Sequence, residues 1–258
     1  MIQSNTSHSD IKGLPLRAKT AFVTGASRGI GASVATQLAR AGADVAINYR
    51  NKDARAREVG DAISALQRRV LLLKADITDP RDVSASFDQI RAEWGRLDVL
   101  VLNASGGLEK DKDAGYAMRL NLDAQVSLVH AAIPLFRQGG RMVFVTSHLA
   151  HFYRVKPVYD GYESVAASKK AGEEALRNMI PELSHLGIRL VVVSGDLIEG
   201  TITPKLLQRQ SPGLIEARRQ QVGILPNVDD FAAAIVKAVV DDSYPSGATI
   251  YVGSTEWK

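Results

Sequence analysis

The sequence predicts an α/β protein with a single doubly wound, Rossmann-type parallel sheet of about seven strands and helices on both faces. Three observations support this fold class. Short apolar runs alternate with helical patterns from residue 19 to the end, and a glycine-rich turn, Thr24–Gly31, follows the first apolar run. In addition, no linker, repeat or low-complexity block divides the 258 residues.

The order of elements follows from these apolar runs and from the helical patterns between them. The expected strands are Thr20–Thr24, Val45–Tyr49, Val70–Leu73, Val99–Leu102, Met142–Thr146, Leu190–Val193 and Thr249–Val252. The expected helices cover about 30–41, 52–67, 81–94, 114–137, 162–185 and 228–241. Residues 1–18 are polar, so we expect a mobile tail before one domain at 19–258. The segment at about 195–227 interrupts the alternation and is interpreted as a substrate lid, or alternatively as a surface loop without a gating role.

Composition narrows the possible functions. Apolar residues make up 45% of the chain, enough for a sizeable core, and the absence of cysteine excludes disulfides and thiolate chemistry. The formal charge of +4 is spread among acidic residues, which argues against a nucleic-acid surface. No apolar run reaches the roughly 18 residues of a membrane span, and no secretory signal is visible. We therefore expect a cytoplasmic protein with no membrane contact, and we expect no metal site because the histidines lack carboxylates at ligand spacing.

The turn Thr24–Gly31 has the chemistry of a phosphate-binding loop. Gly25 allows a tight strand-to-helix turn, Gly29 lets the backbone approach a pyrophosphate, and Gly31 lets the helix pack closely on the strand. The helix that follows offers free N–H groups and a positive dipole end. The spacing Gly-x3-Gly-x-Gly resembles the cofactor loop of the short-chain dehydrogenase/reductase family, and the resemblance extends over about residues 19–253. It implies a nicotinamide dinucleotide cofactor.

The end of the second strand favours NADP over NAD. An NAD site has an acidic residue about twenty positions after the glycine turn. Here Arg50 stands at that point and no carboxylate follows until Asp53. The forked guanidinium donors of Arg50, and of Arg28 in the turn, suit a 2′-phosphate. The alternative is that both arginines simply face solvent.

Two further strand ends resemble cofactor-contacting segments of the family. Asp76 is expected to accept a hydrogen bond from the adenine amine, whereas Asp79 is expected to cap the next helix. Asn103–Gly107 resembles the family turn that lies beside the cofactor. The expected cofactor-binding residues are Gly25, Ser27, Arg28, Gly29, Ile30, Gly31, Arg50, Asp76, Ile77, Asn103, Ala104, Lys169, Asp196 and Thr201.

The resemblance also implies a catalytic group of serine, tyrosine, lysine and asparagine. Ser147, Lys169 and Asn121 lie at the matching positions. The family tyrosine stands four residues before the lysine, where it donates a proton and has its pKa lowered by the lysine; here that position is Val165. Valine has no proton to donate, so the spacing is altered in this chain.

Tyr162 is the best substitute, provided that the helix begins after it and its hydroxyl folds back toward Ser147. Tyr159 and Tyr153 are weaker candidates, as are His148 and His151, which are more often surface or substrate-contacting groups at such a junction. Two alternatives remain. Another group or a water could be the acid, or the chain could have lost hydride chemistry altogether.

The sixth strand ends in Ser194–Ile198 where the family has Pro-Gly. Asp196 could stabilise the oxidised nicotinamide or bind a polar substrate, or it could be capped by local N–H groups. Thr201 is a candidate for contact with the carboxamide or a phosphate.

Together these patterns predict an NADP(H)-dependent oxidoreductase that transfers hydride between the nicotinamide and a ketone or secondary alcohol. The alternatives are a family-fold NADP-binding protein without reductase activity, serving as sensor or scaffold, and a non-redox lyase or isomerase. The partner is expected to be a small, partly apolar molecule, because Leu206, Leu207 and Ile215 lie in the lid. The resemblance further implies a homotetramer assembled through the helices at about 114–137 and 162–185, although their small residues could equally pack on the sheet.

Overall fold

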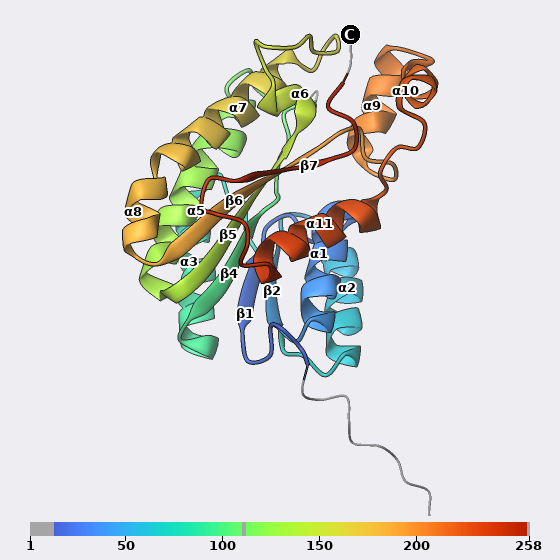
Figure 1. Cartoon of the computed structure of the whole chain (residues 1–258). Coiled ribbons are helices and arrows are strands. Elements are labelled where there is room, and N and C mark those ends of the chain that lie inside the picture. Colours follow the sequence, from blue (N-terminus) through green and yellow to red (C-terminus); the bar gives the residue numbers. More distant parts are fainter. Residues whose placement is uncertain (1–12, 110–111, 257–258) are drawn as a thin grey trace, which may run out of the picture.

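The structure, a computed structural model, describes residues 13–109 and 112–256. It contains a seven-stranded, all-parallel sheet in the order β3-β2-β1-β4-β5-β6-β7 (Figure 1). The strands are β1 (Thr20–Val23), β2 (Asp44–Tyr49), β3 (Val70–Lys74), β4 (Leu97–Leu102), β5 (Phe136–Ser147), β6 (Ile188–Gly195) and β7 (Thr249–Val252). The predicted doubly wound fold is confirmed.

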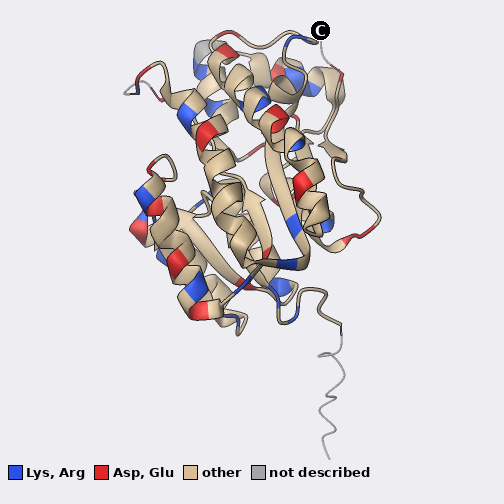
Figure 2. Cartoon of the chain, turned by 90° about the vertical axis from the view of Figure 1, so that its left-hand side faces the viewer, with Lys and Arg blue, Asp and Glu red and all other residues tan. Residues whose placement is uncertain are grey.

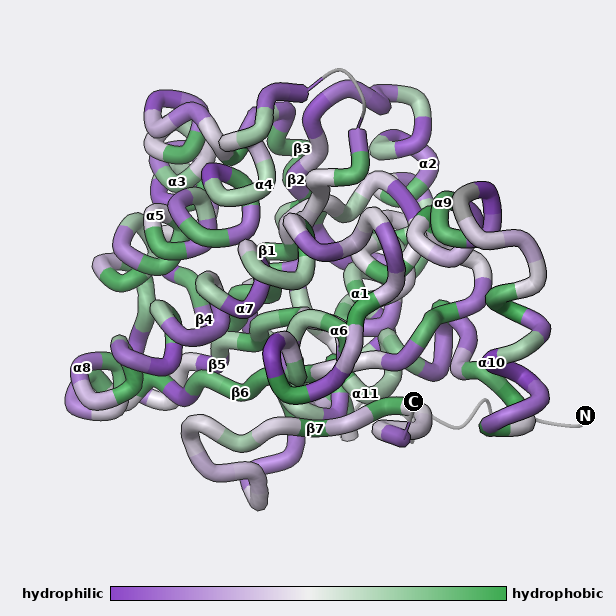
Figure 3. The backbone as a smooth tube through the Cα atoms, turned by 90° about the horizontal axis from the view of Figure 1, so that it is seen from above, coloured by the Kyte–Doolittle hydropathy of each residue, from purple (hydrophilic) through white to green (hydrophobic). Residues whose placement is uncertain are grey.

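The central strands are apolar on both faces because helices cover both sides of the sheet. Every residue of β1 and β4 is buried. One face packs on α1 (Gly29–Arg40), α2 (Asp53–Ala65) and α11 (Val228–Val240), and the other on α3 (Pro80–Trp94), α5 (Ala124–Ala132) and α7 (Glu163–Asn178). Seen along the sheet, hydrophobic strands fill the centre and hydrophilic residues lie outside (Figure 3). Alternation of short apolar runs with amphipathic helices is what such a layered arrangement requires.

The outer helical surface carries charges of both signs. On the side that faces the viewer in Figure 2, Lys and Arg are intermixed with Asp and Glu. No helix of the described residues is both long enough and apolar enough to cross a bilayer.

Two of the expected helices are interrupted. The segment 114–137 forms α4 (Tyr116–Met118), the π-helical turn η1 (Arg119–Asp123), α5 and the 3-10 turn η2 (Ile133–Leu135), and strand β5 already begins at Phe136. The segment 162–185 divides into α7 and α8 (Ile180–His185), because Pro181 has no N–H for a continuous helix and instead occupies the first turn of α8. The end of the predicted 114–137 helix was therefore wrong, and the single 162–185 helix is in fact two.

The remaining short elements lie near the carboxyl ends of the strands. They are α6 (His148–His151), α9 (Ile202–Gln210) and α10 (Leu214–Val222). The last two occupy most of the predicted lid. Leu207 of α9 belongs to an apolar cluster that also contains Leu149, Tyr162 and Val165. Most of the predicted N-terminal tail lies outside the described residues, whereas Leu16 is buried and its N–H donates to the Ala41 carbonyl.

The strand order reverses between β1 and β4, which are neighbours although two strands separate them in sequence. In open parallel sheets, ligands bind in the crevice at the carboxyl ends of such strands. The topology therefore places a binding site where the Thr24–Gly31 turn and the Asn103–Gly107 segment leave the sheet.

Candidate active site

A cavity of about 630 Å³ opens at this end of the sheet. It extends from the Gly25–Gly31 turn to the ends of β5 and β6 and to the α9–α10 segment. The predicted site residues that line it are Gly25, Ser27, Arg28, Gly29, Ile30, Gly31, Arg50, Asp76, Ile77, Asn103, Ala104, Ser147, Tyr162, Lys169, Asp196 and Thr201. Asn121 is not among the lining residues. We call the part formed by the ends of β1–β4 the glycine-turn half, and the part around Thr146, Ser147, Tyr162 and Lys169 the hydroxyl half.

The glycines of the turn are required by geometry. Gly25 and Gly29 have φ angles of +64° and +56°, which L side chains rarely adopt. A Cβ on Gly31 would lie 2.5 Å from the Gly25 carbonyl oxygen and 2.6 Å from the Asn103 side-chain nitrogen. A Cβ on Gly29 would meet no atom within 4 Å, so the backbone there faces open space at the start of α1. The turn therefore presents bare backbone and a helix N-terminus to the cavity.

Two asparagines hold the glycine turn in place. The Asn48 side chain accepts from the Gly25 N–H at 3.2 Å and donates to the Ala75 carbonyl at 2.9 Å. The Asn103 side chain donates to the Thr24 carbonyl at 2.9 Å. These bonds join the ends of β1, β2, β3 and β4 to one another.

The carboxylates after β3 divide their roles. Asp79 stands directly before α3 and accepts from the Arg81 N–H at 2.9 Å, as expected for a helix cap. Asp76 Oδ1 accepts from the N–H and the hydroxyl of Thr78, while its Oδ2 lies 3.6 Å from Arg50 Nη1. Its expected contact with an adenine amine remains a prediction.

Tyr162 lies beside Ser147 in the hydroxyl half. Helix α7 begins at Glu163, so Tyr162 directly precedes the helix. The direction of its side chain is therefore not set by the helical repeat. Its hydroxyl lies 3.3 Å from Ser147 Oγ, at the end of β5. Val165, the residue four positions before Lys169, is instead buried in the apolar cluster under the lid. The expected juxtaposition of Tyr162 and Ser147 is therefore present.

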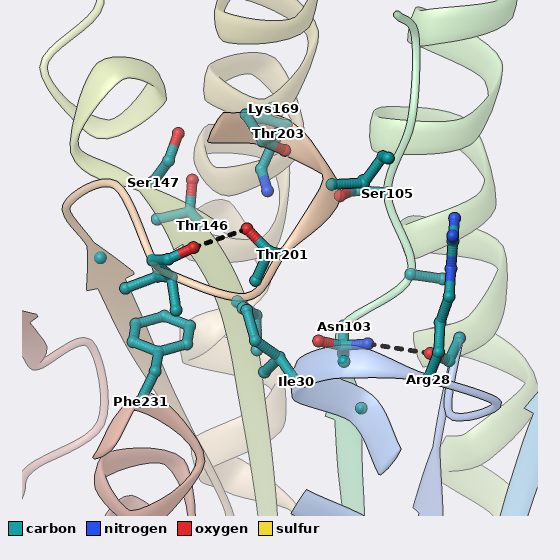
Figure 4. A pocket seen from close by; sticks show the side chains of 18 of the residues that line it. Arg28, Ile30, Asn103, Ser105, Thr146, Ser147, Lys169, Thr201, Thr203 and Phe231 are labelled. Carbon is teal, nitrogen blue, oxygen red and sulfur yellow. Dashed lines mark hydrogen bonds between the residues drawn. The ribbon is translucent and has the colours of Figure 1, made fainter. Parts of the chain in front are cut away.

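Lys169 is a nearly buried cation without a partner. Its side chain is 7% exposed, and within the described residues its amine makes no hydrogen bond or ion pair. Burial lowers its pKa from 10.5 to about 8. The amine points into the cavity, which Thr146 and Thr201 also line (Figure 4). Thr146 Oγ1 is likewise buried without a partner among the described residues.

The pKa of Tyr162 is raised, unlike the lowered pKa that the resemblance implies for the family tyrosine. Burial raises it above the ordinary value, and the hydrogen bond with Ser147 lowers it only in part. The family lysine lowers the pKa of a tyrosine four residues before it, whereas Tyr162 lies seven residues before Lys169. Removal of the hydroxyl from water dominates instead, because the neutral phenol is favoured in an apolar surrounding. Tyr162 therefore retains its proton at neutral pH.

The side chain of Asn121 makes hydrogen bonds that connect two segments of the fold. Its amide nitrogen donates to the Gly106 carbonyl and to Ser168 Oγ, both at 2.9 Å, and its Oδ1 accepts from the Gly106 N–H at 3.3 Å. The backbone of Asn121 lies in η1 against Gly172 of α7, where a Cβ would overlap its carbonyl oxygen. Asn121 thus joins the segment after β4 to α7 from behind the cavity.

Asp196 is neutralised by an arginine that sequence reasoning missed. Arg218 of α10 donates from Nε and Nη2 to the two carboxylate oxygens, at 3.1 and 2.7 Å, and the Leu197 N–H donates to Oδ1. The side chains of Asp196 and Arg218 are only 6% and 2% exposed. Arg218 also donates to the carbonyls of Ser254 and Glu256. The pair fastens α10 to the end of β6 and to the C-terminal segment.

The two histidines after Ser147 also have partners. His148 Nδ1 lies 2.8 Å from Ser194 Oγ, and burial lowers its pKa to about 4, so the ring is neutral at pH 7. His151 Nδ1 lies 2.8 Å from the buried Glu173 carboxylate. The first contact joins α6 to β6 and the second joins α6 to α7, so both rings pack between elements.

Sequence reasoning missed Tyr116 and Thr146, which line the cavity, whereas Tyr159, a weaker candidate for the acid, also lines it. Thr146 directly precedes Ser147 on a strand and could have been found from that position. Tyr116 and Arg218 come from short helices whose placement depends on tertiary packing, and no local pattern marks them.

Comparison with known proteins agrees with this geometry. The profile of the short chain dehydrogenase family matches residues 19–211. Hydroxynaphthalene reductase arp2 of Aspergillus fumigatus is 32% identical over 208 residues, 78% of this chain and 74% of that protein. Cyclohexanol dehydrogenase of a Rhodococcus species is 33% identical over 218 residues, covering 75% and 79% of the two chains.

A solved structure extends the agreement to the fold. The crystal structure of a short chain dehydrogenase from Burkholderia cenocepacia in complex with NADP has a TM-score of 0.79 and 31% identity. The match covers 93% of this chain and 98% of that one. The glycine turn, the strand order and the serine and lysine positions thus occur in a chain that belongs to the short-chain dehydrogenase/reductase family of oxidoreductases.

Proposed function

We propose that the protein is an NADP(H)-dependent oxidoreductase that interconverts a ketone and a secondary alcohol. The observation that carries the proposal is the pair of hydroxyls of Ser147 and Tyr162, 3.3 Å apart on the wall of the cavity that also receives the Lys169 amine. Such a pair can hold a carbonyl oxygen and pass it a proton. Related chains named as a reductase and a dehydrogenase support the reaction class.

The cavity fits a phosphorylated dinucleotide. The bare backbone at Gly29 and the N-terminus of α1 suit the pyrophosphate, and Arg28 and Arg50 suit a further phosphate. The Lys169 amine and the Thr146 hydroxyl, which have no partner in the described part of the chain, also line the cavity, where ribose hydroxyls and a carboxamide would offer partners. When bound, the reduced nicotinamide would supply the hydride.

Tyr162 serves as the proton donor in this proposal. Its raised pKa keeps the phenol protonated at neutral pH, and Ser147 Oγ accepts or donates to orient the substrate oxygen. As the alkoxide develops, its basicity exceeds that of the phenolate, and the proton moves from Tyr162 to the product oxygen. Solvent protons then restore Tyr162.

The substrate is proposed to be an apolar cyclic ketone. Leu149, Tyr159, Leu197 and Ile202 line the cavity, and Leu149 and Leu197 belong to the apolar cluster that also contains Leu207 of α9. The names of the relatives cited above refer to ring compounds. A flat or cyclic apolar skeleton would bury its surface against these side chains, with only the carbonyl directed at the hydroxyls.

We also propose that the α9–α10 segment forms a lid over the substrate and that the protein assembles into an oligomer. Thr203 and Lys205 of α9 line the cavity together with Arg218 of α10, which supports a lid over the substrate. We also propose a homotetramer that uses the outer surfaces of the α4–α5 and α7–α8 segments. Light scattering at several concentrations would test it.

The test is reduction of a panel of cyclic ketones with NADPH deuterated at C4, followed by mass spectrometry of the alcohol. We expect deuterium on the carbinol carbon and faster turnover with NADPH than with NADH. Tight NADPH binding without label transfer to any ketone would instead favour the sensor or scaffold alternative. Conversion of substrate without loss of NADPH would favour a lyase or isomerase.

A further inference from the structure

Arg50, the expected partner of a 2′-phosphate, is held by a tyrosine from another part of the chain. Arg50 Nη1 donates to the Tyr116 hydroxyl at 2.5 Å. Tyr116 is the first residue of α4, 66 positions later in sequence, and it is only 5% exposed. The guanidinium carbon lies 5.9 Å from the centre of the tyrosine ring. A buried group thus fixes one end of a partly exposed arginine.

The same nitrogen of Arg50 faces a carboxylate on its other side. Asp76 Oδ2 lies 3.6 Å from Nη1, and Asp76 is itself fixed by Thr78. Both contacts therefore use Nη1, while Nη2 and Nε of Arg50 have no partner within the described residues. The two remaining donors form the fork that binds two oxygens of a phosphate.

The surroundings of this fork carry charges of both signs, and Lys74 is paired with Asp53 at 3.1 Å. A second hollow of about 490 Å³ adjoins the cavity at Arg50, and it is lined by Lys74 and Lys112 as well as by Asp76 and Asp82. The Lys112 amine lies 5.1 Å from the centre of the Tyr116 ring. The Tyr116 hydroxyl accepts from Arg50, and it has no second partner within the described residues, so it holds the guanidinium alone.

From this arrangement we infer that Tyr116 is a specificity-determining residue that acts through Arg50 and makes the site select a dinucleotide whose adenosine ribose carries a 2′-phosphate. The inference rests on the proposed function for the presence of a nicotinamide dinucleotide. Without the tyrosine hydroxyl, Arg50 keeps only Asp76, a carboxylate that draws the guanidinium away from a second anion. Tyr116 is therefore a positioning residue, and its loss affects the phosphate and not the rest of the cofactor.

The experiment is calorimetry with 2′,5′-ADP and 5′-AMP, which differ only in the 2′-phosphate. The measured quantity is the ratio of their dissociation constants. We expect the wild-type protein to prefer 2′,5′-ADP. We expect Tyr116→Phe, which keeps the ring, to reduce this preference about tenfold. A tenfold change in the ratio corresponds to roughly 1.4 kcal/mol of binding free energy. Tyr153→Phe is the matched control, because Tyr153 donates to Glu163 outside the cavity, and it should leave the ratio unchanged.

A double-mutant cycle separates positioning from a general disturbance. In an Arg50→Met background, Tyr116→Phe should change the ratio by less than about twofold, because the arginine through which it acts is absent. An unchanged ratio in Tyr116→Phe alone would overturn the inference while the proposed function stands. So would equal losses with both ligands, since a merely structural role predicts them. A wild-type protein that binds the two ligands equally would instead remove the NADP preference from the proposed function, and the inference with it.

Discussion

The glycine-turn half and the hydroxyl half of the cavity are built in different ways. In the glycine-turn half, Asn48 and Asn103 already bond to backbone groups of the neighbouring strand ends. In the hydroxyl half, Lys169 and Thr146 lack partners within the described residues, and Tyr162 comes from outside the helix that carries Lys169. The first half is held by side-chain bonds to backbone groups, whereas the second brings together side chains from several elements.

The difference shows where such a chain can change. The φ angles and close contacts of the turn admit little besides glycine, so its sequence pattern is constrained. A proton donor needs only to bring its hydroxyl to the right place. Tyr162 reaches Ser147 from the residue before α7, and Val165 is free to pack in the apolar cluster.

The largest effect is expected at the ion pair that holds the lid segment. Arg218→Met leaves the Asp196 carboxylate buried without its partner, and we expect a loss of about 3–5 kcal/mol in the free energy of unfolding. Urea denaturation measures it. Arg219→Met is the control, because Arg219 is half exposed and pairs with Glu199 at the surface, where a loss of less than about 1 kcal/mol is expected. Equal losses would show that side-chain pairing does not hold this half.

A somewhat smaller effect is expected from Lys169, and it depends on pH. The pKa of about 8 in the folded state lies below the ordinary 10.5, so the folded state disfavours the charged amine. This cost is fully present below pH 8 and disappears as the pH rises toward 10.5. Without cofactor, Lys169→Met should therefore exceed the wild type in stability at pH 7 by an amount on the order of 3 kcal/mol, with the gap closing above pH 8.

Denaturation at pH 7 and pH 10 measures this gap. Lys205→Met is the comparison variant, since Lys205 is an exposed residue of α9. A Lys169→Met protein that is less stable than the wild type at pH 7 would contradict the description of Lys169 as an unpaired buried cation. That outcome would also weaken the contrast between the two halves.

The smallest of these effects concerns the packing of α7. An added methyl at Gly172 would overlap the Asn121 carbonyl, so Gly172→Ala must shift α7, which carries Lys169. We expect a loss of about 1–3 kcal/mol from overpacking and a larger relative loss in turnover than in NADPH affinity. Gly13→Ala, whose methyl meets no atom within 4 Å, should change neither. A Gly172→Ala protein that loses affinity and turnover in equal proportion would show that the two halves are not independent.

Much of the fold could be predicted from the sequence. The alternation of apolar runs and helical patterns reflects burial of both sheet faces, and the glycine turn reflects backbone angles, so both leave local signals. The break before Pro181 was also visible in principle, because proline cannot continue a helix. The pairing of Asp196 with Arg218 and of Arg50 with Tyr116 could not be predicted. Each joins residues more than 20 positions apart through tertiary packing that no local pattern encodes.

The role of Tyr162 as the proton donor is central to the proposed function, and one measurement tests it directly. Single-turnover reduction of a ketone by the NADPH-loaded protein should be slowed about 100-fold or more by Tyr162→Phe, while the dissociation constant of NADPH stays within about threefold of the wild type. Tyr153→Phe, in the same region but outside the cavity, should react at the wild-type rate. A Tyr162→Phe protein that reduces the ketone as fast as the wild type would contradict the account.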